Sequence, residues 1–137
     1  MRPDPSFSRS RRAAAVVAAI LVVAAGLAVS ELAPAGFLSD AAGDALYAAL
    51  IYVLAVSLIP RAAPWRPALG ALAWCTAVEL FQLTGLPEAW GATWRPLMLV
   101  FGNVFAVTDL IFYALGVALA CAVDAAAGVR RRGDMRT

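Results

Sequence analysis

The sequence predicts an all-α integral membrane protein that crosses the bilayer as a four-helix bundle with both termini in the cytoplasm. Of its 137 residues, 63% are hydrophobic and 15% are charged, and the mean hydropathy is +0.80. A soluble domain of this length has too little interior for so much apolar surface, whereas in a bilayer lipid covers it. Four apolar stretches separated by turn-forming residues predict the helices, at residues 13–29, 41–59, 68–83 and 97–123.

The first stretch, Ala13 to Val29, contains no charged residue. At about 1.5 Å per residue, a helix here is roughly 25 Å long and can cross the hydrocarbon layer. An alternative interpretation is a cleaved signal peptide, because a basic start and an apolar stretch precede Ala33-Pro34-Ala35. The length of the apolar stretch and the proline inside the cleavage triplet favour a retained helix.

The second stretch, Ala41 to Ile59, carries one charged residue, Asp44, and Asp40 stands where a helix N-cap is expected. The connection from Pro60 to Pro67 is short. We therefore expect the second and third helices to form an antiparallel hairpin.

The third stretch, Ala68 to Leu83, is shorter and contains Glu79 and Gln82. The fourth, Leu97 to Val123, contains Asp109 and is long enough to tilt in the membrane. Both stretches therefore carry polar side chains inside an apolar segment.

The arginines predict the orientation, because positively charged loops resist translocation. Those expected on one side of the membrane are Arg2, Arg9, Arg11, Arg12, Arg61, Arg66, Arg130, Arg131, Arg132 and Arg136. Arg95 falls on the other side. The basic N-terminal segment, residues 1–12, and the basic C-terminal tail, residues 124–137, are therefore both expected in the cytoplasm.

Two carboxylates are expected near the middle of the membrane. At 1.5 Å per helical residue, Glu79 lies about 16 Å from the inner face and Asp109 about 18 Å from the outer face. A carboxylate at the bilayer centre costs roughly 2.5–3.5 kcal/mol on insertion scales, so it usually faces a protein interior or a wet cavity. Asp44 and Gln82 are expected closer to the outer surface, and Arg95 at the outer mouth of the fourth helix.

Helical spacing places several of these residues on common faces. One face of the fourth helix carries Gly102, Ala106, Asp109, Tyr113 and Gly116. Gly102 and Ala106 have the small-xxx-small spacing that lets two helices approach closely. We therefore expect Gly102, Ala106, Tyr113 and Gly116 to serve helix packing, and Asp109 to face a neighbouring helix.

Two interpretations of the polar groups within the helices stay open. In the first, they form interhelical hydrogen bonds that hold the helices together. In the second, they line an outward-opening pocket for a polar ligand, a lipid headgroup or a proton. The residues assigned to this pocket are Asp44, Glu79, Gln82, Arg95 and Asp109.

Several short motifs occur in a characteristic order. They are Gly43-Asp44-Ala45-Leu46-Tyr47, Glu79-Leu80-Phe81-Gln82, Arg95, Phe101-Gly102, Asp109-Leu110 and Tyr113-Ala114-Leu115-Gly116. With these motifs the chain resembles a bacterial membrane family of unknown function, DUF2809, which is related to the VanZ-like proteins. The resemblance covers residues 36–123. It implies a multi-pass protein of the bacterial cytoplasmic membrane and names no reaction.

The residue types weigh against an enzyme. The chain has no histidine, which excludes His-based triads and His-ligated metals, and no cluster has metal-ligand spacing. No cofactor is expected. No nucleic-acid partner is expected either, because the basic residues follow membrane topology.

The expected partners are the lipid bilayer and a lipid headgroup or small polar ligand, and the sequence leaves a homo-oligomer open. We expect an envelope-associated binding or accessory protein. The alternative is a proton-linked transporter or channel subunit, since carboxylates within the membrane are typical of proton relays.

Overall fold

A computed structural model of the chain describes residues 5–94, 96 and 106–134. The helices it describes are α1 (Pro5–Leu32), α2 (Phe37–Leu58), α3 (Trp65–Gln82), α4 (Leu86–Thr93) and α6 (Val107–Asp134). No strand occurs among these residues. The predicted all-α class is therefore confirmed for the described part of the chain.

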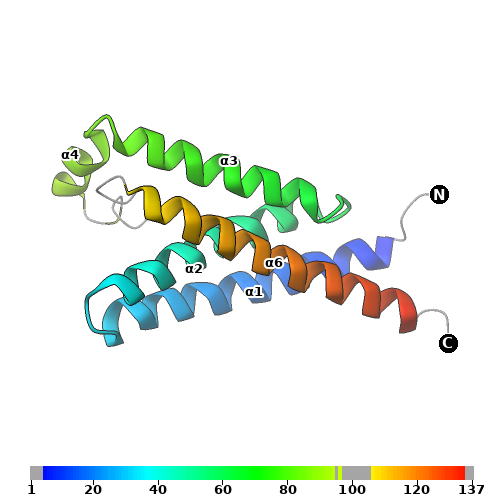
Figure 1. Ribbon diagram of the computed structural model, residues 1–137. Coiled ribbons are helices and arrows are strands. Elements are labelled where there is room, and N and C mark those ends of the chain that lie inside the picture. The colour runs from blue at the N-terminus through cyan, green and yellow to red at the C-terminus, as the bar shows by residue number, and fades with distance from the viewer. Residues whose placement is uncertain (1–4, 95, 97–105, 135–137) are drawn as a thin grey trace.

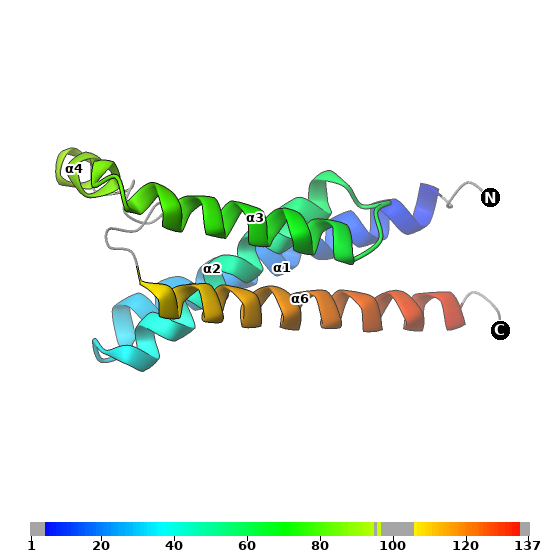
Figure 2. The same cartoon turned by 45° about the horizontal axis from the view of Figure 1, so that its top comes forward.

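The four long helices lie side by side and alternate in direction along the chain (Figure 1). Helix α2 is central, because it contacts α1, α3 and α6. Helix α3 also contacts α6. The start of α1 and the end of α6 lie at one end of the molecule, which we call the terminal end, and the α2–α3 turn lies there too (Figures 1 and 2). The α1–α2 turn and α4 lie at the opposite end, the far end (Figures 1 and 2).

Among the described residues, three helices are long and apolar enough to cross a membrane, over Ser8–Leu32, Phe37–Leu58 and Val107–Val129. Helix α3 meets the same criterion only together with α4, from which it is bent by 85°. Gly85 lies at this bend with a φ of 71°, a left-handed conformation that glycine adopts without a steric penalty. The predicted third stretch therefore corresponds to a helix that turns sharply at the far end.

The helix boundaries differ most from the prediction near the chain ends. Helix α1 begins at Pro5 and not at Ala13, and α6 extends to Asp134, beyond Val123. Alanine and arginine are both strong helix formers, so the end of an apolar stretch does not end the helix. Helix α6 begins at Val107, and residues 97–105 of the predicted fourth helix lie outside the described residues.

The buried core surrounds α2. Its members include Ala48, Tyr52, Ala71, Cys75, Tyr113 and Val117. Large apolar side chains such as Ile20 and Leu119 are exposed on the outer faces, with exposed fractions of 65% and 69%. An extensive exposed apolar surface on long helices is the pattern of a protein surrounded by lipid.

Candidate functional site

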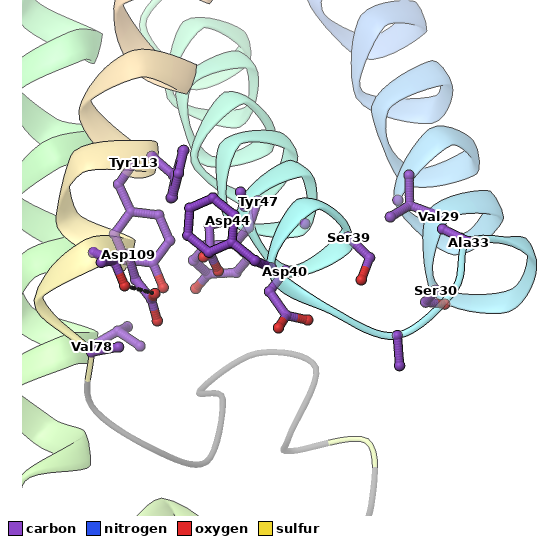
Figure 3. A pocket seen from close by; sticks show the side chains of 18 of the residues that line it. Val29, Ser30, Ala33, Ser39, Asp40, Asp44, Tyr47, Val78, Asp109 and Tyr113 are labelled. Carbon is purple, nitrogen blue, oxygen red and sulfur yellow. Dashed lines mark hydrogen bonds between the residues drawn. The ribbon is translucent and has the colours of Figure 1, made fainter.

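An open pocket of about 840 Å³ lies at the far end, where α1 and α3 end and where α2 and α6 begin (Figure 3). Its polar lining consists of three carboxyl groups, three small hydroxyl groups, two tyrosines and one amide. These are Asp40, Asp44, Asp109, Ser30, Ser39, Thr108, Tyr47, Tyr113 and Gln82. The pocket is therefore acidic and mixed in character, because apolar side chains such as Phe37, Val78 and Phe112 also line it.

Helix α2 supplies two of the carboxyl groups. Asp40 and Asp44 are one helical turn apart and share a face, and Asp40 lies in the first turn, where the helix dipole favours negative charge. The Oγ of Ser39 fixes the start of the helix: it accepts a hydrogen bond from the Gly36 N–H at 3.0 Å and donates one to the Gly36 carbonyl at 2.7 Å. The N-cap is therefore Gly36, and the predicted N-cap at Asp40 is wrong because the helix begins earlier, at Phe37.

Helix α6 supplies the third carboxyl group, Asp109, in its first turn. The Asp109 N–H donates to the Ala106 carbonyl at 3.1 Å, and the Thr108 hydroxyl donates to Asp109 Oδ1 at 3.2 Å. Asp44 and Asp109 both face the cavity (Figure 3), and their carboxyl groups are close enough to interact electrostatically. Because α6 begins at Val107, Asp109 lies near the start of the candidate span Val107–Val129. The sequence had predicted a position near the middle of a longer helix that begins at Leu97.

Glu79 lies behind the pocket wall and is fully buried. Its Oε1 accepts a hydrogen bond from the Tyr113 hydroxyl at 2.7 Å, and its Oε2 accepts one from the Ala106 N–H at 3.4 Å. Tyr113 also lines the pocket. Its side chain therefore connects the open cavity with a carboxyl group that the cavity does not reach directly.

The remaining predicted residues are placed as follows. Gln82 is buried, lies one turn after Glu79 and lines the pocket. Ala106 directly precedes α6. Arg95 and Gly102 lie outside the described residues.

Gly116 lies at a close contact between α6 and the backbone of α2. A Cβ built on Gly116 would lie 2.9 Å from the Cα of Ala45 and closer still to its carbonyl oxygen. Only a residue without a side chain fits at this distance. This contact fixes how α6 is placed against α2, and so where Asp109 and Tyr113 lie relative to Asp44.

The charge of the pocket limits what it can bind. Among the described residues that line it there are carboxyl groups and no basic side chain. The described residues also contain no group of three or more His, Cys, Asp or Glu side chains arranged to hold a metal ion. The described lining therefore presents carboxyl groups, hydroxyl groups and one amide to the cavity.

A second polar cluster, at the terminal end, was missed from the sequence. Arg11 of α1 is 7% exposed. Its Nε and Nη2 donate to the two carboxylate oxygens of Asp124 in α6 at 3.0 and 2.6 Å. Its Nη1 donates to the carbonyls of Pro60 and Ala62 in the α2–α3 turn. The Tyr52 hydroxyl donates to Asp124 at 2.8 Å.

A signal for this cluster was present in the sequence. Asp124 directly follows the fourth apolar stretch and lies on the arginine-rich side. The prediction places this acid in the basic cytoplasmic tail, residues 124–137, and gives it no partner. Which arginine pairs with it depends on the packing of α1 against α2.

The chain was compared with known proteins. A family model described as "Protein of unknown function (DUF2809)" matches residues 33–117. This chain belongs to that family. The matched range contains the three carboxyl groups of the pocket, Glu79 and Gln82, and it excludes Arg11 and Asp124. No curated protein and no solved structure gave a match to the chain.

Proposed function

We propose that this DUF2809 protein is a membrane-embedded binding protein whose far-end pocket holds an ammonium group, such as the amine headgroup of a phospholipid. The observation that carries the proposal is the pocket lining, in which Asp40, Asp44 and Asp109 are not balanced by a basic side chain of the described residues. A primary ammonium supplies both the positive charge and the N–H donors that carboxylates accept strongly.

Aromatic rings beside the acids support the same ligand class. The rings of Phe37 and Phe112 are 5.6 Å apart, and those of Tyr47 and Tyr113 are 6.1 Å apart. All four side chains line the pocket. Because a cation over a ring face gains roughly 0.5–2 kcal/mol, an ammonium group benefits from both the acids and the rings. An anionic headgroup would be repelled.

The membrane setting is part of this proposal. In it, α1, α2, α3 and α6 each cross the cytoplasmic membrane of a bacterium once, with both termini inside and the pocket open to the outside. The arginines near the terminal end support this orientation. The relation to the VanZ-like proteins also belongs here, supported by the Glu79 to Gln82 motif and by Asp109.

One observation favours a second candidate function, proton-linked transport. The Asp44 and Asp109 carboxyl groups are close together, and Tyr113 links the pocket to the buried Glu79. Chains of titratable groups are typical of proton relays. Binding is the preferred function because most core side chains of the described residues, including Ala48, Ala71 and Val117, have no titratable group that could relay a proton.

Thermal unfolding of the detergent-purified protein tests the proposal, with dihexanoyl-phosphatidylethanolamine as the probe and dihexanoyl-phosphatidylglycerol as its anionic counterpart. A ligand that binds only the folded state stabilises it by about 2.7 kcal/mol at 100 times its Kd. We expect the amine lipid to raise the Tm and the anionic lipid to leave it unchanged. Asp44→Asn and Asp109→Asn should each reduce the shift.

Glu88→Gln is the matched control, because Glu88 is an exposed acid at the same end that does not line the pocket. Equal Tm shifts with both lipids would contradict the proposal. Proton flux into vesicles that depends on Asp44 and Asp109 would support transport instead.

A further inference from the structure

A second cavity, of about 460 Å³, lies along the side of the molecule. Helix α2 forms its floor, and α1 and α6 form its walls. Over most of its length the lining is small and apolar, with Ala14, Ala18 and Val22 from α1, Ala49 from α2 and Ala120 from α6. We call this cavity the side groove.

The side groove becomes polar at the terminal end. Arg11 and Asp124 line it there and join α1 to α6 through two hydrogen bonds, with Tyr52 beside them. The ion pair therefore bridges the groove near the terminal end. From this end to Val22 the groove follows α1 for about 16 Å, at 1.5 Å per residue.

We propose that the side groove holds one acyl chain of a phospholipid from the leaflet at the terminal end. The groove lies within the candidate spans of α1, α2 and α6, so it is at a depth where acyl chains surround the protein. Water does not fill an apolar void of this kind, and an empty one would leave its lining without packing partners. An acyl chain fills the apolar part of the groove, and its ester end lies where the groove becomes polar.

The ion pair that bridges the groove distinguishes this occupant from a helix of a second copy of the chain. A membrane-spanning helix is about 10–12 Å wide with its side chains and continues through the whole bilayer. Laid along the groove, it would run into the Arg11–Asp124 pair. An acyl chain is thinner, and its ester and headgroup can lie beside the charged pair.

This inference does not depend on the pocket at the far end, and groove-filling substitutions test it. The protein is expressed in bacterial membranes and purified in a mild detergent, and the phospholipid retained per chain is measured by mass spectrometry. We expect the wild type to retain a phospholipid and Ala18→Phe to lose about tenfold in retention, the change that about 1.4 kcal/mol of lost affinity produces. Ala18→Phe should also raise the Tm of the delipidated protein, because the ring fills the cavity.

Ala120→Phe fills the groove from the other wall and keeps the test decisive if Ala18→Phe does not fold. Ala118→Phe is the matched control, because Ala118 lies on the same helix, is exposed and does not line the groove. Full retention of lipid by both groove variants would overturn the proposal, and so would an equal loss in the control. A lipid-free dimer that Ala18→Phe dissociates would also overturn it, because a second copy would then cover the groove.

Discussion

The two ends of this molecule use carboxyl groups in opposite ways. At the terminal end, the guanidinium of Arg11 is matched by both oxygens of Asp124 and by two backbone carbonyls. At the far end, carboxyl groups face an open cavity, and no basic side chain of the described residues lines it. The balanced cluster ties three helices and a turn together. The unbalanced cluster keeps its charge available for a ligand.

The difference follows from what desolvation costs. A buried charge is tolerated when hydrogen bonds satisfy it, and removal of one partner then leaves the other uncompensated. Asp40 is exposed, and Asp44 and Asp109 are only partly buried, so these carboxyl groups depend less on such a partner. Substitutions at the terminal end should therefore lower the stability of the protein, whereas substitutions at the far end should mainly weaken ligand binding.

The largest expected effect concerns which end faces outward. In a background without Cys75 and Cys121, a cysteine at Glu88 should react with an impermeant thiol reagent in intact cells once any outer barrier is opened. A cysteine at Ala62, in the α2–α3 turn, should not react, because positively charged loops stay inside. The reverse labelling pattern would place the pocket on the cytoplasmic side.

Arg11→Ala should destabilise the protein by about 3 kcal/mol, because it leaves Asp124, whose side chain is only 18% exposed, without its cation. Chemical denaturation in detergent measures the loss. Arg9→Ala is the matched control, since Arg9 is exposed on the same helix, and surface substitutions usually change stability by no more than about 0.5 kcal/mol. Equal effects of the two variants would show that the terminal cluster does not hold the helices together.

Gly116→Ala should destabilise by about 1–3 kcal/mol, because its methyl group meets the Ala45 backbone, which cannot move aside as a flexible side chain would. Gly70→Ala, where a Cβ meets nothing within 4 Å, should instead stabilise α3 by up to about 1 kcal/mol. Thermal unfolding of both variants separates backbone packing from the charge effects at the two ends. A stabilising Gly116→Ala would mean that α2 and α6 are farther apart.

The smallest effects are expected at the far end. Asp44→Asn and Asp109→Asn should each change stability by no more than about 1 kcal/mol, and the pair should show a coupling energy of about 0.5 kcal/mol or more because the carboxyl groups are neighbours. A double-mutant cycle in detergent measures it. The pair Asp44→Asn and Glu88→Gln should be additive. Additivity in the first pair as well would separate Asp44 from Asp109 and remove the basis of the acidic pocket.

The helices could be predicted because their signals are local. Apolar stretches bounded by proline and glycine predict each long helix, and the motif that ends α3 at Glu79 and Gln82 was recognised from a few neighbouring residues. The sequence also separated the arginines into alternate loops, which anticipated the start of α1 and the end of α6 at one end (Figure 1). The boundaries near Ala13 and Val123 were less accurate, because alanine and arginine continue a helix beyond the apolar core.

What the sequence determined by itself is therefore the all-α class, the apolar segments and the set of polar residues within them. The tertiary structure alone decided their partners: Asp109 lies beside Asp44, Glu79 accepts from Tyr113, and Asp124 binds Arg11. Spacing along one helix says which residues share a face, but not which face of the next helix they meet. The facing residues depend on the rotation of each helix and on the distance between helices. Close contacts between residues far apart in the sequence, such as Gly116 against Ala45, fix both.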